Sequence, residues 1–452
     1  MLLSSKTQLK RVIALSLPMA GSRFLQMLSG FISTMMVAHL GKTILAACAL
    51  IGATLTPILM IFISIVFSLS FIVGQSFGAK KYSEIGALVQ QGALLSLILG
   101  VLMMICCWFA DTALYWFHED PAKLVYVRQY FHILMWGAIP ILLQSCLEQF
   151  FYGVLKQRIV VVINFLSVLI GIPIAYCFIF GKFGMPQLGV GGLALTFVIQ
   201  ACFGFSSLLL CVCFKSDFLK FEVFKKRSHT GLIYLRQIFR IGWPMSVQFG
   251  GELGAFFVVT MMIGWLGTDA LAATQVVQQW MFLVIVPIFA MSEASGILVG
   301  QSVGAREFSH LNTIARASLI LSLGLVLLID FGFVFFPHFF VSFYMDATSA
   351  KNAGVLTLVP QLFLLMAITL IFNSIRDVIT GSLRGLFDTQ FPMQIGLFVM
   401  WCLVLPLGYF FAFTLHLNVI GFRIGGNIGL LIGAVIIYWR WRVKLRGYGP
   451  VL

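Results

Sequence analysis

A few ionisable residues interrupt long apolar stretches of this chain and are the first candidates for chemistry. If these stretches cross a membrane, a carboxylate near the bilayer centre costs about 2.5–3.5 kcal/mol by insertion scales, so it needs a partner or a task. Carboxylates in such places often carry protons or ions. The residues concerned are Arg23, Glu148, Glu252, Glu293, Asp330, Arg376 and Asp377.

Glu252 is the strongest candidate among them. It lies near the middle of the apolar stretch 237–264, in the sequence QFGGELGAFF, where Gly250, Gly251 and Gly254 open the backbone to a close neighbour. No Lys or Arg lies within one helical turn of it. This pattern indicates a carboxylate that is alternately protonated or that coordinates Na⁺. The alternative is a glutamate held neutral by hydrogen bonds between helices.

The other charges of the second half suggest structural pairs. Glu293 and Arg376 lie at similar depth, so we expect them to pair, unless Glu293 attracts a cationic substrate. Asp377 either pairs with Arg376 or Arg384 near the helix end, or supplies a functional charge. Asp330 lies near the predicted outer end of its helix, where we expect water to reach it.

The composition requires lipid around most of the surface. Of 452 residues, 60% are hydrophobic and 10% are charged, against about 25% charged in soluble domains. The formal charge of +14 gathers in short connections, which is typical of cytoplasmic loops and argues against a nucleic-acid partner. Nine cysteines lie in apolar stretches without metal-ligand spacing, so we expect small buried hydrophobic residues and no metal site.

Twelve apolar stretches reach the length of about 20 residues that a membrane helix needs. The excess of Lys and Arg in alternate connections predicts that both termini and the central connection lie in the cytoplasm. We expect residues 1–11 to remain as a cytoplasmic end, because they run into an apolar stretch too long for a signal peptide. The stretches lie near 12–38, 45–75, 86–109, 125–151, 160–181, 187–213, 237–264, 271–300, 313–335, 355–382, 392–413 and 417–438.

The two halves of the chain repeat one sequence. TMMVAHLG at 34–41 matches TMMIGWLG at 260–267, and VGQSFGAKKY at 73–82 matches VGQSVGAREF at 299–308. Both pairs are 226 residues apart, since 260 − 34 and 299 − 73 give the same value. Each repeat holds six helices, an even number, so both halves share one orientation in the membrane. Such duplication is typical of secondary transporters.

Weaker matches extend the repeat. GVLK at 153–156 faces GSLR at 381–384 at a spacing of 228, and Pro173 faces Pro406 at a spacing of 233. The drift predicts inserted residues near 386–390. The predicted organisation is an N-terminal lobe at 1–214, a cytoplasmic linker at 215–230 and a C-terminal lobe at 231–452.

These doubled motifs, with GSLRG at 381–385 and a proline in the first and seventh helices, resemble the multidrug and toxic compound extrusion (MATE) family. The resemblance covers essentially the whole chain and is closest to the NorM-type branch. It implies an all-α membrane protein whose two six-helix lobes form a V-shaped central cavity. It further implies export of cationic or amphipathic drugs in exchange for inward Na⁺ or H⁺, with no cofactor beyond that ion. We expect a monomer in the plasma or inner membrane, in contact with lipid.

The resemblance also assigns site residues. It gives Glu252 the coupling cation, and counting back from GSLRG places the family's second carboxylate at Asn373, which is an amide here. Asp377, one turn later, could supply the missing charge. Many relatives carry an Asp where this chain has Ser33, so the coupling role moves toward Glu252. The repeat counterpart of Glu252 is Gln26, because 252 − 226 is 26.

Two further sets of residues are candidates around this site. Pro18 and Pro244 each remove a backbone hydrogen bond, so they bend their helices and serve either as structural kinks or as hinges. An adaptable, partly apolar substrate cavity is predicted from side chains near the candidate charges. Its predicted members are Gln26, Ser33, Phe256, Met261, Met262 and Glu293.

Rival functions find less support in the sequence. No nucleophile with a base and no paired acids with metal spacing are present, so we do not expect an enzyme. No phosphate-binding loop appears, so ATP is not the expected driving force. The alternative is a lipid-linked precursor flippase of the same wider superfamily. Its anionic substrate would favour several cavity arginines, for which Arg23, Arg376 and Arg423 are the candidates.

Overall fold

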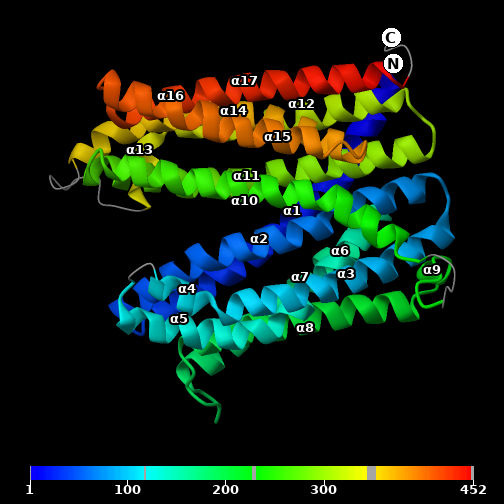
Figure 1. Cartoon of the computed structure of the whole chain (residues 1–452), viewed down its shortest axis with the longest axis horizontal. Helices are drawn as coiled ribbons and strands as arrows, with labels where there is room; N and C mark the ends of the chain where they lie inside the picture. The colour runs from blue at the N-terminus through cyan, green and yellow to red at the C-terminus, as the bar shows by residue number, and fades with distance from the viewer. Residues whose placement is uncertain (1, 117–118, 226–230, 344–352, 449–452) are drawn as a thin grey trace. The chain divides into compact units, whose positions relative to one another are not determined.

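The chain is helical, which confirms the predicted fold class. The computed structural model describes residues 2–116, 119–225, 231–343 and 353–448, and every regular element in these ranges is a helix (Figure 1). The elements in chain order are α1 (Leu2–Ala38), α2 (Lys42–Gly78), α3 (Tyr82–Trp108), α4 (Ala110–Trp116), α5 (Pro121–Leu134), η1 (Met135–Gly137), α6 (Ala138–Gly153), α7 (Gln157–Phe180), α8 (Val190–Phe214), α9 (Ser216–Leu219), α10 (Ile233–Gly264), α11 (Thr268–Gly304), α12 (His310–Phe335), α13 (Pro337–Ser342), α14 (Ala353–Gly385), α15 (Gln390–Phe398), η3 (Val399–Val404), α16 (Leu405–Tyr409), η4 (Phe410–Thr414) and α17 (Asn418–Arg446).

Within the described residues, twelve helical segments are long and apolar enough to cross a membrane, and they coincide with the twelve predicted stretches. The fourth comprises α5, η1 and α6; the eleventh comprises α15, η3, α16 and η4, of which η3 and η4 are π-helical. The last helix continues to Arg446, well beyond its predicted end at 438. The buried side chains of Trp441 and Leu445 hold these extra turns against the rest of the C-unit.

The helices form two compact units. The N-unit is residues 21–249, and the C-unit is residues 1–20 together with 250–452. Both divisions fall inside a helix, α1 and α10, rather than in a connection. The predicted lobes, 1–214 and 231–452, follow the sequence repeat instead and stay a prediction.

Each unit is built around one central helix. In the N-unit, α6 lies against α2, α3 and α8. In the C-unit, α14 lies against α11, α12 and α17, and α14 runs alongside α17 for much of its length (Figure 1). The helices α2, α3, α6 and α8 have α11, α12, α14 and α17 as their counterparts in the repeat. The same packing therefore occurs twice, as the repeat predicts.

The repeat register of the central helices differs from the predicted one. Both helices end in a turn with a left-handed residue, Leu155 with φ 59° and Phe387 with φ 60°. These are 387 − 155, or 232, residues apart. The predicted spacing of 228 was therefore wrong by one helical turn. The inserted residues therefore lie before α14, except for one. That one lies in the connection 386–389, because α7 and α15 begin 390 − 157, or 233, residues apart.

Glycine packing supports the corrected register. A Cβ on Gly153 would press on the backbone oxygen of Ser70, and a Cβ on Gly385 would press on that of Gly296. The two partners are 296 − 70, or 226, residues apart, which is the spacing of the second and eighth helices. The predicted match of GVLK with GSLR was wrong by one turn because Gly381 and Gly385 lie one turn apart on the same face of α14, and either glycine can be paired with Gly153 in the sequence.

The first part of the predicted linker packs as a structural element. Phe218 of α9 and Phe221 after it are each 2% exposed. Their rings lie 6.0 and 5.5 Å from the ring of Phe150 at the end of α6. The linker segment that follows α8 is therefore part of the N-unit core. Residues 226–230 of the predicted linker lie outside the described residues.

Polar contacts secure the same segment. Lys156 donates to Asp217 across 2.8 Å, and this hydrogen bond lowers the pKa of the exposed Asp217 carboxyl. Gln90 of α3 donates to the backbone oxygen of Val223 across 2.6 Å. The connection is thus tied to α3 and to the turn after α6.

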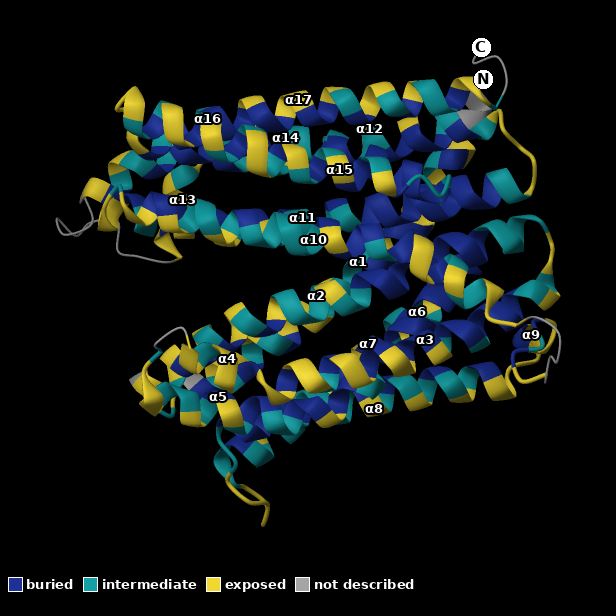
Figure 2. Ribbon diagram, in the orientation of Figure 1, coloured by how far each residue is buried: buried dark blue, intermediate teal, exposed yellow. Residues whose placement is uncertain are grey.

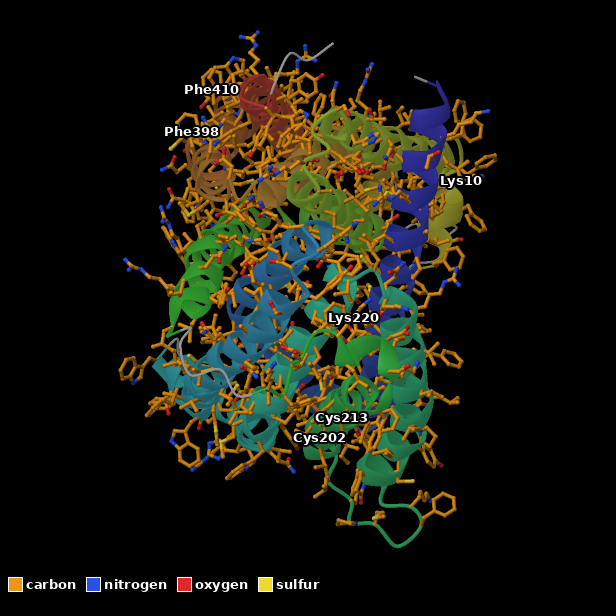
Figure 3. All side chains as sticks on the ribbon, turned by 90° about the vertical axis from the view of Figure 1, so that its right-hand side faces the viewer. Lys10, Cys202, Cys213, Lys220, Phe398 and Phe410 are labelled. Carbon is orange, nitrogen blue, oxygen red and sulfur yellow. The ribbon has the colours of Figure 1, made fainter. Side chains whose placement is uncertain are left out.

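The exposed surface of the helices is apolar over much of its length, as lipid contact requires. Figure 2 shows exposed residues along α8 and α17. Phe398, at the end of α15, and Phe410, the first residue of η4, are 46% and 47% exposed (Figure 3). Burial of all cysteines was a wrong expectation, because a lipid-facing position accepts an apolar thiol as readily as a core position does. Four cysteines are exposed, Cys106, Cys202, Cys213 and Cys402.

Candidate functional site

Glu252 lies in the part of α10 that belongs to the C-unit, and its side chain is 19% exposed. The glycine before it allows a neighbour to approach closely. A Cβ on Gly251 would meet the side chain of Leu397, and Trp401 donates from Nε1 to the carbonyl oxygen of Gly251 across 3.1 Å. The predicted opening of the backbone around Glu252 is therefore used by the eleventh span, which holds this segment of α10 in place.

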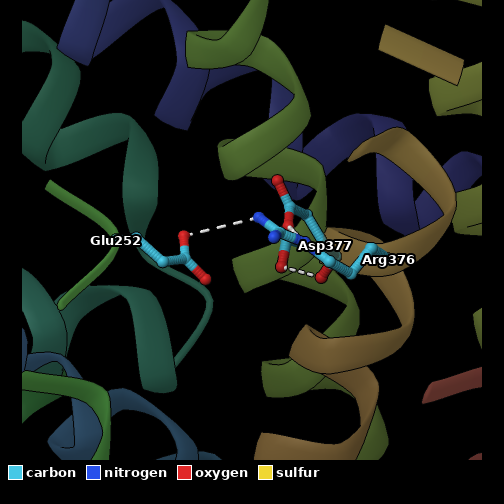
Figure 4. Close-up of polar contacts among 4 residues, drawn as sticks. Glu252, Arg376 and Asp377 are labelled. Atoms are coloured by element: carbon cyan, nitrogen blue, oxygen red, sulfur yellow. Dashed lines mark hydrogen bonds and ion pairs between the residues drawn. The ribbon is translucent and has the colours of Figure 1, made fainter. Parts of the chain in front are cut away.

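Arg376 of α14 joins two carboxylates (Figure 4). Its Nη2 lies 3.4 Å from Oε2 of Glu252, and its Nε lies 3.0 Å from Oδ1 of Asp377. The Arg376 side chain is 10% exposed and that of Asp377 is 24% exposed. A guanidinium stays charged in proteins, so a permanent cation lies between two partly buried acids from two helices.

Close packing of α14 on α11 fixes this arrangement. Ser292 of α11 donates from Oγ to the carbonyl oxygen of Asp377 across 2.5 Å. One turn along α14, a Cβ on Gly381 would clash with the backbone oxygen of Ser292. Small residues spaced by four on both helices, Gly381 with Gly385 and Ser292 with Gly296, let the two backbones touch. The carboxylates are thus presented by a rigid pair of helices.

Two more buried charges lie close by. Arg384 of α14 is 5% exposed and Glu293 of α11 is 4% exposed. The Arg384 guanidinium is within electrostatic range of Glu252, Asp377, Arg376 and Glu293. With every group ionised, three carboxylates and two guanidiniums carry −3 + 2, a net charge of −1. The group can therefore accept one further positive charge without becoming positive itself.

The structure confirms one of the predicted pairs and leaves others open. Asp377 pairs with Arg376, as one of the two readings of Asp377 expected. Asn373 is half-buried one turn away, and its side chain makes no hydrogen bond within the described part of the chain. The expected pairing of Glu293 with Arg376 stays a prediction.

The pairing of Glu252 with Arg376 was missed from the sequence, because the two residues are 124 positions apart. Arg376 lies on another helix, and sequence spacing predicts side-chain contacts only within about one turn of the same helix. The sequence could have suggested this pair, because Glu252 and Arg376 are intramembrane charges of opposite sign and such charges usually pair with one another.

The predicted cavity residues have different surroundings. Phe256 packs on Phe282, with ring centroids 5.8 Å apart. Met262 is 7% exposed within the apolar core of the C-unit, whereas its neighbour Met261 is 55% exposed. In the N-unit, Gln26 is exposed and Ser33 is buried. Their membership of a substrate cavity stays a prediction.

The two predicted helix-bending prolines lie inside continuous helices. Pro18 lies within α1 and is half-buried, and Pro244 lies within α10 and is buried. The division between the compact units follows each proline within a few residues, at Gly21 and at Gly250. This placement is compatible with both predicted roles, kink and hinge.

The N-unit contains its own intramembrane polar group. Glu148 accepts hydrogen bonds at Oε1 from Gln144 Nε2 and Asn164 Nδ2, each across 3.0 Å. Asn164 also donates to Ser22 Oγ across 2.6 Å. Three helices, α1, α6 and α7, are thereby joined at this carboxylate. The sequence pointed to Glu148 but not to its amide partners.

The expectation that water reaches Asp330 was wrong. Asp330 is only 5% exposed, and neither of its carboxylate oxygens has a hydrogen-bond partner within the described residues. It lies on α12 one turn before Phe333, whose ring packs on Phe340 and Phe363. The short helix α13, which carries Phe340, packs on this end of α12.

Comparison with known families agrees with this fold. The model of the MatE family matches residues 18–177 and 244–410, one segment in each half of the chain. The chain is 28% identical over 437 residues to a probable multidrug resistance protein NorM of Neisseria meningitidis serogroup B, covering 96% of this chain and 93% of that protein. The corresponding protein of Synechocystis is 26% identical over 437 residues, covering 97% and 95%.

Solved structures show the same fold. A crystal structure of MATE in the bent conformation superposes with a TM-score of 0.88 at 18% identity, covering 98% of both chains. A MOP superfamily transporter from Pyrococcus furiosus superposes with a TM-score of 0.86 at 19% identity, covering 98% of this chain and 96% of that one. At these identities the likeness concerns the fold alone.

Proposed function

This chain belongs to the MatE family of multidrug efflux transporters, and we propose that it exports cationic or amphipathic small organic compounds in exchange for inward Na⁺ or H⁺. Glu252 carries the proposal, because a partly buried carboxylate in a membrane helix is a natural binding group for a coupling cation. Asp377 assists it, and Asn373 can offer a further oxygen one turn away.

The charges around Glu252 support a coupling role. The group formed by Glu252, Asp377, Glu293, Arg376 and Arg384 has a net charge of −1 when all its members are ionised. An inward cation neutralises that charge. For antiport, cation and substrate must favour opposite states of the transporter, or compete for one site, and by linkage each weakens the binding of the other.

The proposed function also implies where and in what form the protein acts. The protein acts as a transporter rather than an enzyme, as a monomer surrounded by lipid in the plasma or inner membrane. Both termini lie in the cytoplasm, as the excess of basic residues in alternate connections predicts. In the C-unit, the first turns of α1 and the last turns of α17 lie at the same end (Figure 1), which supports a common side for both termini.

The test is efflux of ethidium from vesicles with separately imposed Na⁺ and H⁺ gradients, comparing the wild type with Glu252→Gln. Glutamine keeps the shape but cannot take a charge, so we expect a folded protein whose gradient-driven efflux is lost. Glu119→Gln is the matched control, at a half-exposed carboxylate that pairs with Lys123, and this variant should export normally. Undiminished gradient-driven efflux in Glu252→Gln would refute the coupling role. Absence of ethidium efflux in the wild type would favour the flippase with its anionic lipid substrate.

A further inference from the structure

We infer that Arg376 is a built-in counter-ion that makes the Glu252–Asp377 site select protons and reject Na⁺. The inference rests on the proposed antiport, and it concerns which ion drives that antiport. It assigns a specificity-determining role to Arg376, for which the sequence predicted only a structural pair or, in the flippase alternative, a cavity charge.

The first argument is that Arg376 already uses one oxygen of each of the two carboxylates that would have to coordinate a metal ion. Its Nε and Nη2 donate to Asp377 Oδ1 and Glu252 Oε2, at 3.0 and 3.4 Å. Na⁺, a hard cation, requires several oxygen ligands at once. A proton forms a bond to a single carboxylate oxygen and needs no shell of ligands. The site can therefore bind a proton, which needs one carboxylate oxygen, more readily than Na⁺, which needs several.

The supply of acceptors around the guanidinium is also limited. Nη1 of Arg376 is buried and has no hydrogen-bond partner within the part of the chain that the structure describes. The guanidinium thus offers more N–H groups than the surrounding oxygens satisfy. A metal ion entering this group would compete with the N–H groups of Arg376 for the same carboxylate oxygens. Asn373, half-buried one turn away, is not hydrogen-bonded to the group and cannot supply the shell alone.

Charge repulsion acts in the same direction. Na⁺ bound by Glu252 or Asp377 would stand within a few ångströms of the Arg376 guanidinium, and the energy of two like charges rises as their distance falls. The guanidinium cannot lose its proton to relieve this repulsion. Arg384 adds a second positive charge from the same helix. A proton avoids the conflict, because a protonated carboxyl is neutral and no separate cation remains beside Arg376.

The net charge sets how many protons the group takes. The charged groups of this cluster are Glu252 from α10, Glu293 from α11, and Arg376, Asp377 and Arg384 from α14. Arg376 pairs with Glu252 and Asp377, and Arg384 interacts electrostatically with the other four. With all of them ionised, the net charge is −1, so a single proton gives a neutral group. A second proton would make it positive. We therefore expect one proton to be taken up per cycle at this site.

The position of that proton has a structural consequence. Arg376 pairs with Asp377 on its own helix but with Glu252 on another helix, α10. A proton on Glu252 removes the charge that Arg376 attracts and leaves its pair with Asp377 intact. The link between α10 and α14 is then weakened, while α14 stays held to α11 through Ser292 and Asp377. Proton binding is thereby converted into a change at one helix contact.

The test uses the full-length protein in proteoliposomes with ethidium as the exported compound. The wild type should export under a pH gradient and should not respond to a Na⁺ gradient at fixed pH. Arg376→Gln removes the fixed charge, so Na⁺ should now stimulate efflux, by about tenfold if the coupling is of ordinary allosteric size. Arg376→Lys keeps a cation and should still reject Na⁺. Arg128→Gln, an exposed arginine, is the control and should behave as the wild type does.

A second measurement does not depend on transport. The thermal midpoint of the purified protein is compared in NaCl and in choline chloride, because an ion that binds only the folded state raises it. We expect equal midpoints for the wild type and a higher midpoint in NaCl for Arg376→Gln. Stabilisation of the wild type by Na⁺, or efflux of the wild type driven by Na⁺ alone, would overturn the inference while leaving antiport intact. If the proposed antiport itself is wrong, neither the wild type nor any variant will show gradient-driven efflux. The thermal comparison would then still show whether Na⁺ binds to the wild type and to Arg376→Gln.

Discussion

The indole Nε1 of Trp401 donates a hydrogen bond to the backbone oxygen of Gly251 across 3.1 Å, one residue before the candidate coupling carboxylate Glu252. Trp401 lies in the π-helical segment η3, and such segments occur often at functional sites. The indole ring also lies against Gly254, on the next turn of α10. The eleventh span thus positions Glu252 without contributing a charge of its own.

Trp401→Phe should therefore disturb transport more than folding. The variant keeps an aromatic ring but loses the donor, and one hydrogen bond contributes about 1 kcal/mol. We expect a small fall in thermal midpoint, reduced efflux and a displaced pH profile of efflux, because Glu252 is then held less firmly opposite Arg376. Trp439→Phe, at a 58% exposed position of α17, should change none of these. An unchanged pH profile in Trp401→Phe would remove the positioning role.

Gly381→Ala should destabilise the C-unit strongly. A Cβ at this position would clash with the backbone oxygen of Ser292, which belongs to a helix that cannot yield as a flexible side chain does. Overpacking of this kind typically costs about 1–3 kcal/mol, and a clash with backbone lies at the upper end. Gly324→Ala, in α12, is the control, because no atom lies within 4 Å of its added Cβ. A thermal midpoint of Gly381→Ala equal to that of Gly324→Ala would contradict the described contact of α14 with α11.

The sequence predicts the frame of this molecule better than the contacts inside it. Twelve spans and the duplicated packing follow from apolar length and from the repeat at 226, because lipid imposes those patterns on every segment. The error in repeat register arose at Gly381 and Gly385. Two glycines one helical turn apart give equally good matches, and only their partners, Ser292 and Gly296, tell them apart.

The members of the candidate site were predictable, and so was the pair of Asp377 with Arg376, but the pair of Glu252 with Arg376 was not. Glu252, Arg376 and Asp377 all stand out as charges in apolar sequence. Which carboxylate receives the guanidinium depends on the rotation of α10 and α14 about their axes, and that rotation is set by packing at Gly251 and Gly381. The sequence also misplaced Asp330 in water, because it could not show that α13 packs on the end of α12.

Asp330→Asn should raise the stability of the protein. Both oxygens of this buried carboxylate lack a hydrogen-bond partner within the described residues, and a buried group that can carry a charge is costly when nothing compensates it. The amide keeps the shape but cannot ionise, so we expect a gain of about 1 kcal/mol in thermal unfolding near neutral pH. Glu119→Gln, at a half-exposed carboxylate, should stay close to the wild type. A lower midpoint for Asp330→Asn would show that Asp330 has a stabilising partner.

Phe218→Ala should release the segment that follows α8. The ring is 2% exposed and packs on Phe150 and Phe151, with centroids 6.0 and 5.1 Å away, so its removal leaves a cavity in the N-unit core. Truncation of a buried Phe costs about 3–5 kcal/mol. The segment is otherwise held by polar contacts such as that of Lys156 with Asp217, which are exposed and contribute little. We expect a lower thermal midpoint together with faster proteolytic cleavage between α8 and α10. Phe224→Ala tests the same segment at a 63% exposed ring and should leave both quantities unchanged. Equal cleavage rates in the two variants would mean that the segment is not anchored by its aromatic side chains.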